Sequence, residues 1–368
     1  MTFELEPYPY DRLDGLRETA SKHPGGAVDL SIGTPVDPPP RVALSALSSS
    51  GAERSYPPSA GTVAFREACA AWMERRFGVV VEPDWIGACV GTKEYVASLP
   101  GYLKLREEDK GTVLFPALSY PTYSMGARLA GLTPVAVPEL PGGGLDLDAI
   151  SPHDRNDALL LWVNSPSNPT GALTDLAGCA EWGRKYGVPV ASDECYADYT
   201  WDALSAHSVL ESGTGGVLAV HSLSKRSNLA GLRAGFYTGD PSLVSFLVEV
   251  RKHAGLMVPG PVQAAASSAL GDEGHVRRQR AIYHSRLVRL ANILTAVGVE
   301  AGLPRGGFYL WVPVPSSMGD CWDLAGWLAT RLGMVVSPGI FYGEGGKYHV
   351  RVAAVASEDR LDLLASRV

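Results

Sequence analysis

The stretch from Ser222 to Gly235 constrains the fold of this chain more than any other. It follows residues 217–220, an apolar and β-branched run that is typical of a buried strand. The stretch itself carries hydroxyls, glycines and the cations Lys225 and Arg233, so we expect the chain to turn there at a sheet edge. In α/β sheets, ligands bind outside the carboxyl ends of strands. The stretch therefore predicts an α/β fold with a phosphate held near an amine nucleophile.

Composition excludes several classes of protein. The net charge of −7 argues against nonspecific binding to nucleic acid. The five cysteines are scattered and form no C-x-x-C pair, so we expect neither a disulfide framework nor a zinc site, and a reducing cytoplasm fits best. The N-terminus lacks a basic region before an apolar core, and no apolar run reaches the roughly 18 to 20 residues that span a bilayer. We therefore expect no export and no membrane insertion.

Three further apolar runs, residues 113–116, 159–163 and 188–192, predict buried strands that each lead into a polar loop. Thr62 predicts the start of a helix that reaches about residue 76, and residues 275–296 predict a long amphipathic helix. Residues up to about 45 are rich in proline and are expected to be irregular. With 368 residues, the chain is long enough for two domains.

Motifs for other chemistries are missing from the sequence. It has no Walker A loop, no H-E-x-x-H and no G-x-G-x-x-G after a strand, and its eight histidines include no i,i+4 pair. We therefore expect no metal site. His221 precedes the lysine stretch, and we interpret it as a hydrogen-bonded structural residue.

The sequence Ser-Leu-Ser-Lys-Arg-Ser-Asn-Leu-Ala-Gly-Leu-Arg-Ala-Gly resembles the lysine segment of class I/II aminotransferases, which are pyridoxal-phosphate (PLP) enzymes of fold type I. The resemblance implies an α/β fold whose large domain has a mostly parallel central sheet flanked by helices. It also implies a smaller α+β domain built from both termini. We place the large PLP-binding domain at residues 46–270 and the small domain, with its N-terminal arm, at residues 1–45 and 271–368.

The resemblance also gives roles to residues around the PLP ring. Lys225 matches the catalytic lysine that forms a Schiff base with the cofactor and later moves a proton. Asp193 matches the aspartate that pairs with the pyridine nitrogen. Asn168 and Tyr196 match the residues that share the phenolic oxygen, and Tyr120 matches an aromatic residue that stacks on the ring.

Further matches concern the phosphate and the substrate. In the family the substrate α-carboxylate is held by an arginine fork at the position of Arg351, in a pocket lined at the positions of Gly33 and Asn168. A tyrosine of the neighbouring subunit reaches the phosphate, which implies a homodimer with shared active sites. The expected phosphate ligands are Ser222, Arg233, Gly91, Thr92, Lys93 and, from the partner, Tyr56.

Within the family, several segments look like those of the actinobacterial succinyldiaminopimelate aminotransferases. These enzymes interconvert N-succinyl-2-amino-6-oxopimelate and N-succinyl-LL-2,6-diaminopimelate with glutamate and 2-oxoglutarate, on the route to lysine. Such a substrate needs cations beyond Arg351, and the candidates are Arg226, Lys93 and Arg251. The alternatives are an aspartate-type or aromatic-type aminotransferase, a PLP-dependent C–S lyase, or a PLP-binding sensor domain, for which we find no added DNA-binding segment.

Overall fold

The computed structural model describes residues 7–201 and 207–368. Its largest sheet has seven strands in the order β2-β8-β7-β6-β5-β3-β4. These strands are β2 (Ile86–Cys89), β3 (Thr112–Pro116), β4 (Thr133–Val137), β5 (Ala158–Asn164), β6 (Val190–Asp193), β7 (Val217–Ser222) and β8 (Gly235–Gly239).

This sheet is mostly parallel, as the resemblance to the aminotransferases implied. Strands β4, β3, β5, β6 and β7 run in the same direction, whereas β8 is antiparallel to both of its neighbours, β7 and β2. Every residue of β5, β6 and β7 is buried, which explains why these strands are apolar runs rather than alternating ones. Their carboxyl ends therefore meet at one edge of the sheet, where polar residues follow each strand.

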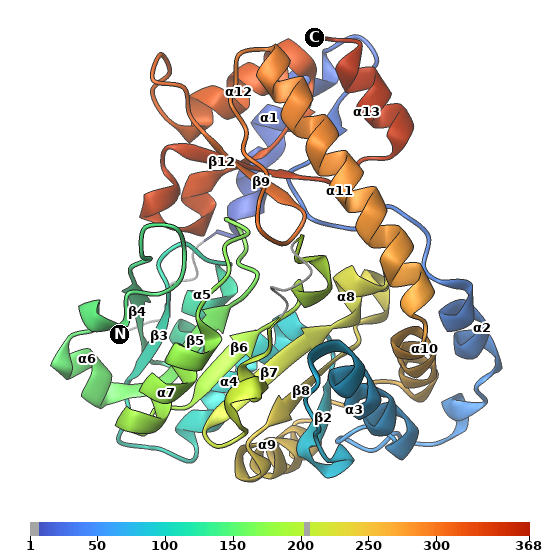
Figure 1. Cartoon of the computed structure of the whole chain (residues 1–368), viewed down its shortest axis with the longest axis vertical. Helices are drawn as coiled ribbons and strands as arrows, with labels where there is room; N and C mark the ends of the chain where they lie inside the picture. Colours follow the sequence, from blue (N-terminus) through green and yellow to red (C-terminus); the bar gives the residue numbers. More distant parts are fainter. Residues whose placement is uncertain (1–6, 202–206) are drawn as a thin grey trace.

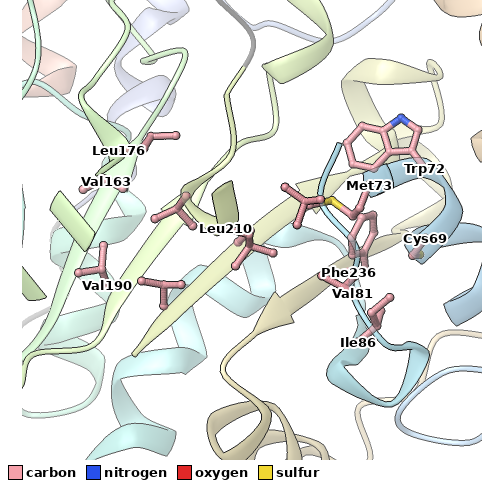
Figure 2. Packing of buried hydrophobic residues seen from close by; sticks show 14 of the residues in the cluster. Cys69, Trp72, Met73, Val81, Ile86, Val163, Leu176, Val190, Leu210 and Phe236 are labelled. Atoms are coloured by element: carbon pink, nitrogen blue, oxygen red, sulfur yellow. The ribbon is translucent and has the colours of Figure 1, made fainter. Parts of the chain in front are cut away.

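Helices cover both faces of the large sheet (Figure 1). In Figure 2, Trp72 and Met73 of the helix α3 lie close to Phe236 of β8, and Val163, Val190 and Leu210 continue the core along the sheet. Thr62 caps α3 by accepting a hydrogen bond from the amide of Phe65, as predicted. The helices are α2 (Arg41–Ser49), α3 (Val63–Phe77), α4 (Thr92–Lys104), α5 (Thr122–Leu129), α6 (Pro152–Asp157), α7 (Leu176–Tyr186), α8 (Leu223–Arg226), α9 (Pro241–His253) and α10 (Gly260–Gly271).

A second group of elements lies beyond the carboxyl edge of the large sheet (Figure 1). It contains a three-stranded antiparallel sheet in the order β11-β12-β9 and a two-stranded parallel sheet of β1 and β10. Helix α11 (Glu273–Ala296) runs from α10 up to this group. The other elements are α1 (Asp14–Ser21), β1 (Val28–Asp29), β9 (Tyr309–Pro313), α12 (Cys321–Leu332), β10 (Met334–Val335), β11 (Ser337–Pro338), β12 (His349–Ala353) and α13 (Glu358–Ala365).

The expectation that residues up to about 45 are irregular is wrong. They include α1 and most of α2, and α2 packs against α10. Both helices are short, eight and nine residues, so tertiary packing rather than a long periodic pattern stabilises them. The domain boundaries at residues 46 and 270 stay a prediction, and residue 46 lies within α2.

No helix in the described part of the chain combines the length and the apolar character needed to cross a bilayer.

Candidate active site

A cavity of about 240 Å³ opens where β5, β6 and β7 end. It collects most of the residues that the sequence singled out from distant segments. Those that line it are Gly33, Thr92, Lys93, Tyr120, Asn168, Asp193, Tyr196, Ser222, Lys225, Arg233 and Arg351. Gly91 adjoins the cavity through Arg233, while Tyr56 is 94% exposed and is not among the described residues that line it.

Lys225 lies in α8, a single turn of helix that begins directly after β7. Ser222 caps this turn by accepting a hydrogen bond from the amide of Ser224 at 3.1 Å. The amino group of Lys225 donates to the carbonyl of Gly33, a contact across 192 residues of sequence. Burial, followed by the nearby positive charges of Arg351 and Arg233, lowers the pKa of Lys225 to about 8. A neutral amine is therefore accessible near physiological pH.

Asp193 is the last residue of β6, and its carboxylate is buried at the floor of the cavity. Its Oδ2 accepts from the hydroxyl of Tyr123 at 2.9 Å, and its Oδ1 accepts from the amide of Cys195 at 3.1 Å. Burial raises the pKa of Asp193 above its usual value. A cationic partner in the cavity would offset this cost and hold the carboxylate in its charged form.

Arg351, on β12, brings a guanidinium group into the same cavity. Its Nη1 donates to Oδ1 of Asn168 and its Nη2 to the carbonyl of Ser31, both at 2.7 Å. The guanidinium carbon lies 4.1 Å from the centre of the Tyr309 ring. Within the described residues, Nε of Arg351 is buried without a hydrogen-bond partner. This donor surface suits a carboxylate ligand.

Another part of the cavity lining is rich in groups that bind anions. Thr92 begins α4, whose first backbone amides are not all used within the helix, and Gly91 precedes it with φ of 75°. Arg233 adopts a left-handed backbone conformation, and its Nη1 donates to the carbonyl of Ala230 at 2.8 Å. The hydroxyl of Ser222 lines the same cavity. This combination of helix amides, hydroxyl and guanidinium can hold a phosphate.

Two of the three candidates for a distal carboxylate lie elsewhere. Arg226 is 3% exposed and forms an ion pair with Asp198 at 3.0 Å. Arg251 is fully buried and donates to both carboxylate oxygens of Glu94 at 2.8 Å. Neither residue lines the cavity in the described part of the chain, and each forms an ion pair with a carboxylate of the protein. Lys93 does line it, and its amino group donates to the hydroxyl of Tyr8 at 3.1 Å.

Ten residues that line the cavity carried no predicted role. In the sequence, Tyr123 ends a Tyr-Pro-x-Tyr pattern and Tyr309 lies in the apolar run 308–312, and neither pattern by itself assigns a function to the side chain. The hydroxyl of Tyr309 lies 2.8 Å from that of Tyr196, so it shares the hydrogen bonds of a predicted site residue. A signal in the sequence existed for Tyr123, because this residue follows the predicted strand at residues 113–116. The ten residues are Tyr8, Tyr10, Ile32, Val96, Tyr123, Asn164, Cys195, Ser224, Ala230 and Tyr309.

Comparison with known proteins decides the family. Residues 26–368 match the family model of aminotransferase class I and II. The chain belongs to this family. It is 42% identical to the 4-dedimethylamino-4-oxo-anhydrotetracycline transaminase OxyQ of Streptomyces rimosus, over 99% of both chains. It is 31% identical to an LL-diaminopimelate aminotransferase of Gloeobacter violaceus, covering 97% of this chain and 94% of the relative.

Solved structures agree with this assignment. A probable N-succinyldiaminopimelate aminotransferase from Thermus thermophilus superposes with a TM-score of 0.87 at 31% identity, covering 97% of this chain and 98% of that one. The protein is thus an aminotransferase of the PLP-dependent fold type I, and PLP is its cofactor.

The cavity fits PLP by the chemistry of its donors. The lining combines a buried carboxylate, an amine of lowered pKa, and a guanidinium beside the start of a helix. These three groups are complementary to a protonated ring nitrogen, an aldehyde carbon and a phosphate, respectively.

Proposed function

We propose that Lys225 is both the covalent tether of PLP and the acid/base of the amino transfer. When bound, PLP supplies an electron sink that stabilises negative charge on the substrate Cα. Lys225 would hold PLP, and its amino group, when free and neutral, would accept the proton from the substrate Cα. The lowered pKa of Lys225 supports this role, because the amine must be neutral to accept the proton.

The residues around Lys225 hold and tune the cofactor in this proposal. Asp193 pairs with the ring nitrogen, and Tyr123 supports that carboxylate by a hydrogen bond of 2.9 Å. Asn168 and Tyr196 bind the phenolic oxygen, and the ring of Tyr120 packs against the pyridine. The phosphate ligands are Ser222, Arg233, Gly91 and Thr92, with Tyr56 of a second subunit, whereas Lys93 faces the substrate.

A homodimer with shared active sites agrees with the exposure of Tyr56, whose side chain is 94% exposed in the single chain. Residue Gly33 lines the cavity and contacts the substrate through its backbone in this proposal.

A cytoplasmic location agrees with the state of the five cysteines, which are all free.

For the substrate, we propose N-succinyl-2-amino-6-oxopimelate and N-succinyl-LL-2,6-diaminopimelate, exchanged with glutamate and 2-oxoglutarate in lysine biosynthesis. Arg351 carries this proposal, because its buried guanidinium faces the cavity where an α-carboxylate has to be held. Lys93 then offers a second cation for a distal carboxylate. The similarity to diaminopimelate-type aminotransferases supports the same class of substrate.

A second candidate follows from one observation. The identity to OxyQ, 42%, exceeds the 31% to the diaminopimelate relative. The second candidate is therefore amino transfer to a larger oxo compound of the kind named for OxyQ. Arg351 would then bind the carboxylate of the amino donor. This alternative keeps every cofactor residue and changes only the acceptor.

Two experiments test these proposals. The purified protein should show the visible absorbance of lysine-bound PLP. In Lys225→Ala, treatment with borohydride should not attach PLP covalently to the protein. A permanent link in that variant would show that another lysine is the tether.

For the substrate, glutamate is added to convert the cofactor to its amine form, and candidate oxo compounds are then compared in single turnovers. No preference for the succinylated oxopimelate over simple 2-oxo acids would exclude the proposed substrate, and a preference for the oxo-anhydrotetracycline would establish the alternative.

A further inference from the structure

The segment Ser31–Pro40, here called the strap, leads from β1 to α2 and lines the cavity on its way. At its start, the carbonyl of Ser31 accepts from Nη2 of Arg351 at 2.7 Å. Two residues later, the carbonyl of Gly33 accepts from the amino group of Lys225. The strap thus places a backbone acceptor against each of the two cations in the cavity that we assign to the reaction.

The other end of the strap is held by Asp37. Its carboxylate accepts from both terminal nitrogens of Arg286, at 2.6 and 2.7 Å. Gln279 adds a third donor at 2.8 Å. Both partners lie on α11, and the side chains of Asp37 and Arg286 are only 17% and 3% exposed. A buried, two-pronged ion pair of this kind is among the strongest side-chain contacts a protein makes.

A second path leads from Asp37 back to the lysine. The side-chain oxygen of Gln279 accepts from Nδ2 of Asn228 at 3.0 Å. Asn228 lies three residues after Lys225, and its left-handed backbone (φ 54°) ends the lysine turn. The amide of Gln279 therefore links the strap to the loop that carries Lys225. Both the strap and this side-chain path connect Asp37 with the same amine.

We propose that Asp37 is a positioning residue of the amino transfer. It holds the strap and the lysine loop in register through α11, so that the carbonyls of Ser31 and Gly33 stay against Arg351 and Lys225. Asp37 contacts neither of these cations, and its effect on the reaction passes through the strap and through Gln279. The proposal rests on the roles assigned above to Lys225 and Arg351.

The PLP-loaded variant Asp37→Asn tests this, because it keeps the volume of the side chain and removes its charge. We expect amide hydrogen exchange over residues 31–37 to become about fivefold faster, because the strap loses its anchor. We also expect the single-turnover rate constant for converting the cofactor with the best amino donor to fall about tenfold. Glu358→Gln is the matched control. Glu358 contacts the same Arg286 at 3.4 Å, but it is 58% exposed and belongs to α13 rather than to the strap.

The control should leave both measurements at the wild-type level. Equal slowing in Glu358→Gln, or a rate constant within about twofold of wild type in Asp37→Asn, would overturn the proposal, because Asp37 would then act only on Arg286 or on stability.

Asn228→Gly is the second variant, to be used if Asp37→Asn does not fold. It suits the left-handed backbone and removes the donations of Asn228 to Gln279 and, at 3.5 Å, to the carbonyl of Pro38 in the strap, while the Asp37–Arg286 pair stays. The rate constant should fall about threefold, and an unchanged rate constant would contradict the proposal. Loss of the tether role would appear separately, as a permanent cofactor link in Lys225→Ala.

Discussion

Arg233 occupies the space that a side chain on residue 91 would need: a Cβ atom on Gly91 would lie 2.1 Å from Nη2 of Arg233. Gly91 also has φ of 75°, a conformation that favours glycine. Glycine at this position therefore lets the guanidinium stand against the start of α4. This close approach supports the proposed phosphate site.

We expect Gly91→Ala to weaken PLP binding, because the new methyl group displaces Arg233 and strains the backbone. The dissociation constant of PLP should rise about tenfold or more, measured by the recovery of visible absorbance on titration. Gly78→Ala is a useful control, since Gly78 also has a positive φ but open space around its Cα. Equal PLP affinity in Gly91→Ala and wild type would show that Arg233 does not bind the phosphate.

Replacement of Arg351 by lysine should impair the binding of the substrate carboxylate. A lysine cannot donate to Asn168 and Ser31 while also presenting two parallel donors to a ligand. We expect kcat/KM for glutamate to fall about 100-fold, mainly through a higher KM, in steady-state assays. Arg289→Lys, in a partly exposed ion pair on α11, should change neither parameter. An unchanged KM in Arg351→Lys would remove Arg351 from the substrate site.

Lys93 should set the preference for a substrate with a distal carboxylate. We expect Lys93→Met to lower kcat/KM for the succinylated oxopimelate about tenfold and for pyruvate less than about twofold, as a lost ion pair would. Lys104→Met, at the other end of α4, is the control. A fall in PLP affinity instead of a change in preference would assign Lys93 to the phosphate.

His221 and Glu194 are buried with Nε2 and Oε2 3.3 Å apart, but within the described residues neither ring nitrogen of His221 makes the hydrogen bond that we expected. Burial raises the pKa of Glu194 from 4.5 to about 8 and lowers that of His221 from 6.5 to about 3. Between pH 6.5 and 8 the histidine is neutral in the folded state, and its remaining titration in the unfolded state is the same in the wild type and in Glu194→Gln, so it cancels in their comparison. Glu194, however, is protonated in the folded state and ionised in the unfolded state, so its stabilising contribution is lost as the pH rises toward 8.

We therefore expect the Tm of the wild type, relative to Glu194→Gln, to fall by about 2 °C or more between pH 6.5 and 8. Thermal melts of both proteins at matched ionic strength measure this difference. Glu358→Gln, at an exposed carboxylate, should run parallel to the wild type. A constant difference between wild type and Glu194→Gln would show that Glu194 is already ionised in the folded protein.

Local patterns predicted the central sheet and the residues at its edge. The strands β5, β6 and β7 are buried and begin with apolar runs that give way to polar residues, so the residue order alone places Asn168, Asp193 and Lys225 at or just after strand ends. The helix α3 and its cap at Thr62 also follow from short-range rules. The resemblance then supplied expected roles for these residues.

Contacts between distant segments could not be predicted in this way. Arg226 and Arg251 looked like free cations, and only the fold brings Asp198 and Glu94 to them. Likewise, Tyr8 and Tyr10 enter the cavity because the N-terminal segment packs beside η8 (Gly339–Tyr342), where the hydroxyls of Tyr10 and Tyr342 lie 2.8 Å apart. No periodicity marks such pairings, since their sequence separations reach 332 residues.

The pairing of β1 with β10 has a consequence for the order of events during synthesis. Val28 and Asp29 leave the ribosome early, yet their partners Met334 and Val335 are made near the end of the chain. Because a nascent chain emerges from its N-terminus, β1 must wait for more than three hundred residues before it can pair. Arg351, which lines the cavity, is made later still, so a nascent chain that ends before it cannot assemble the complete cavity.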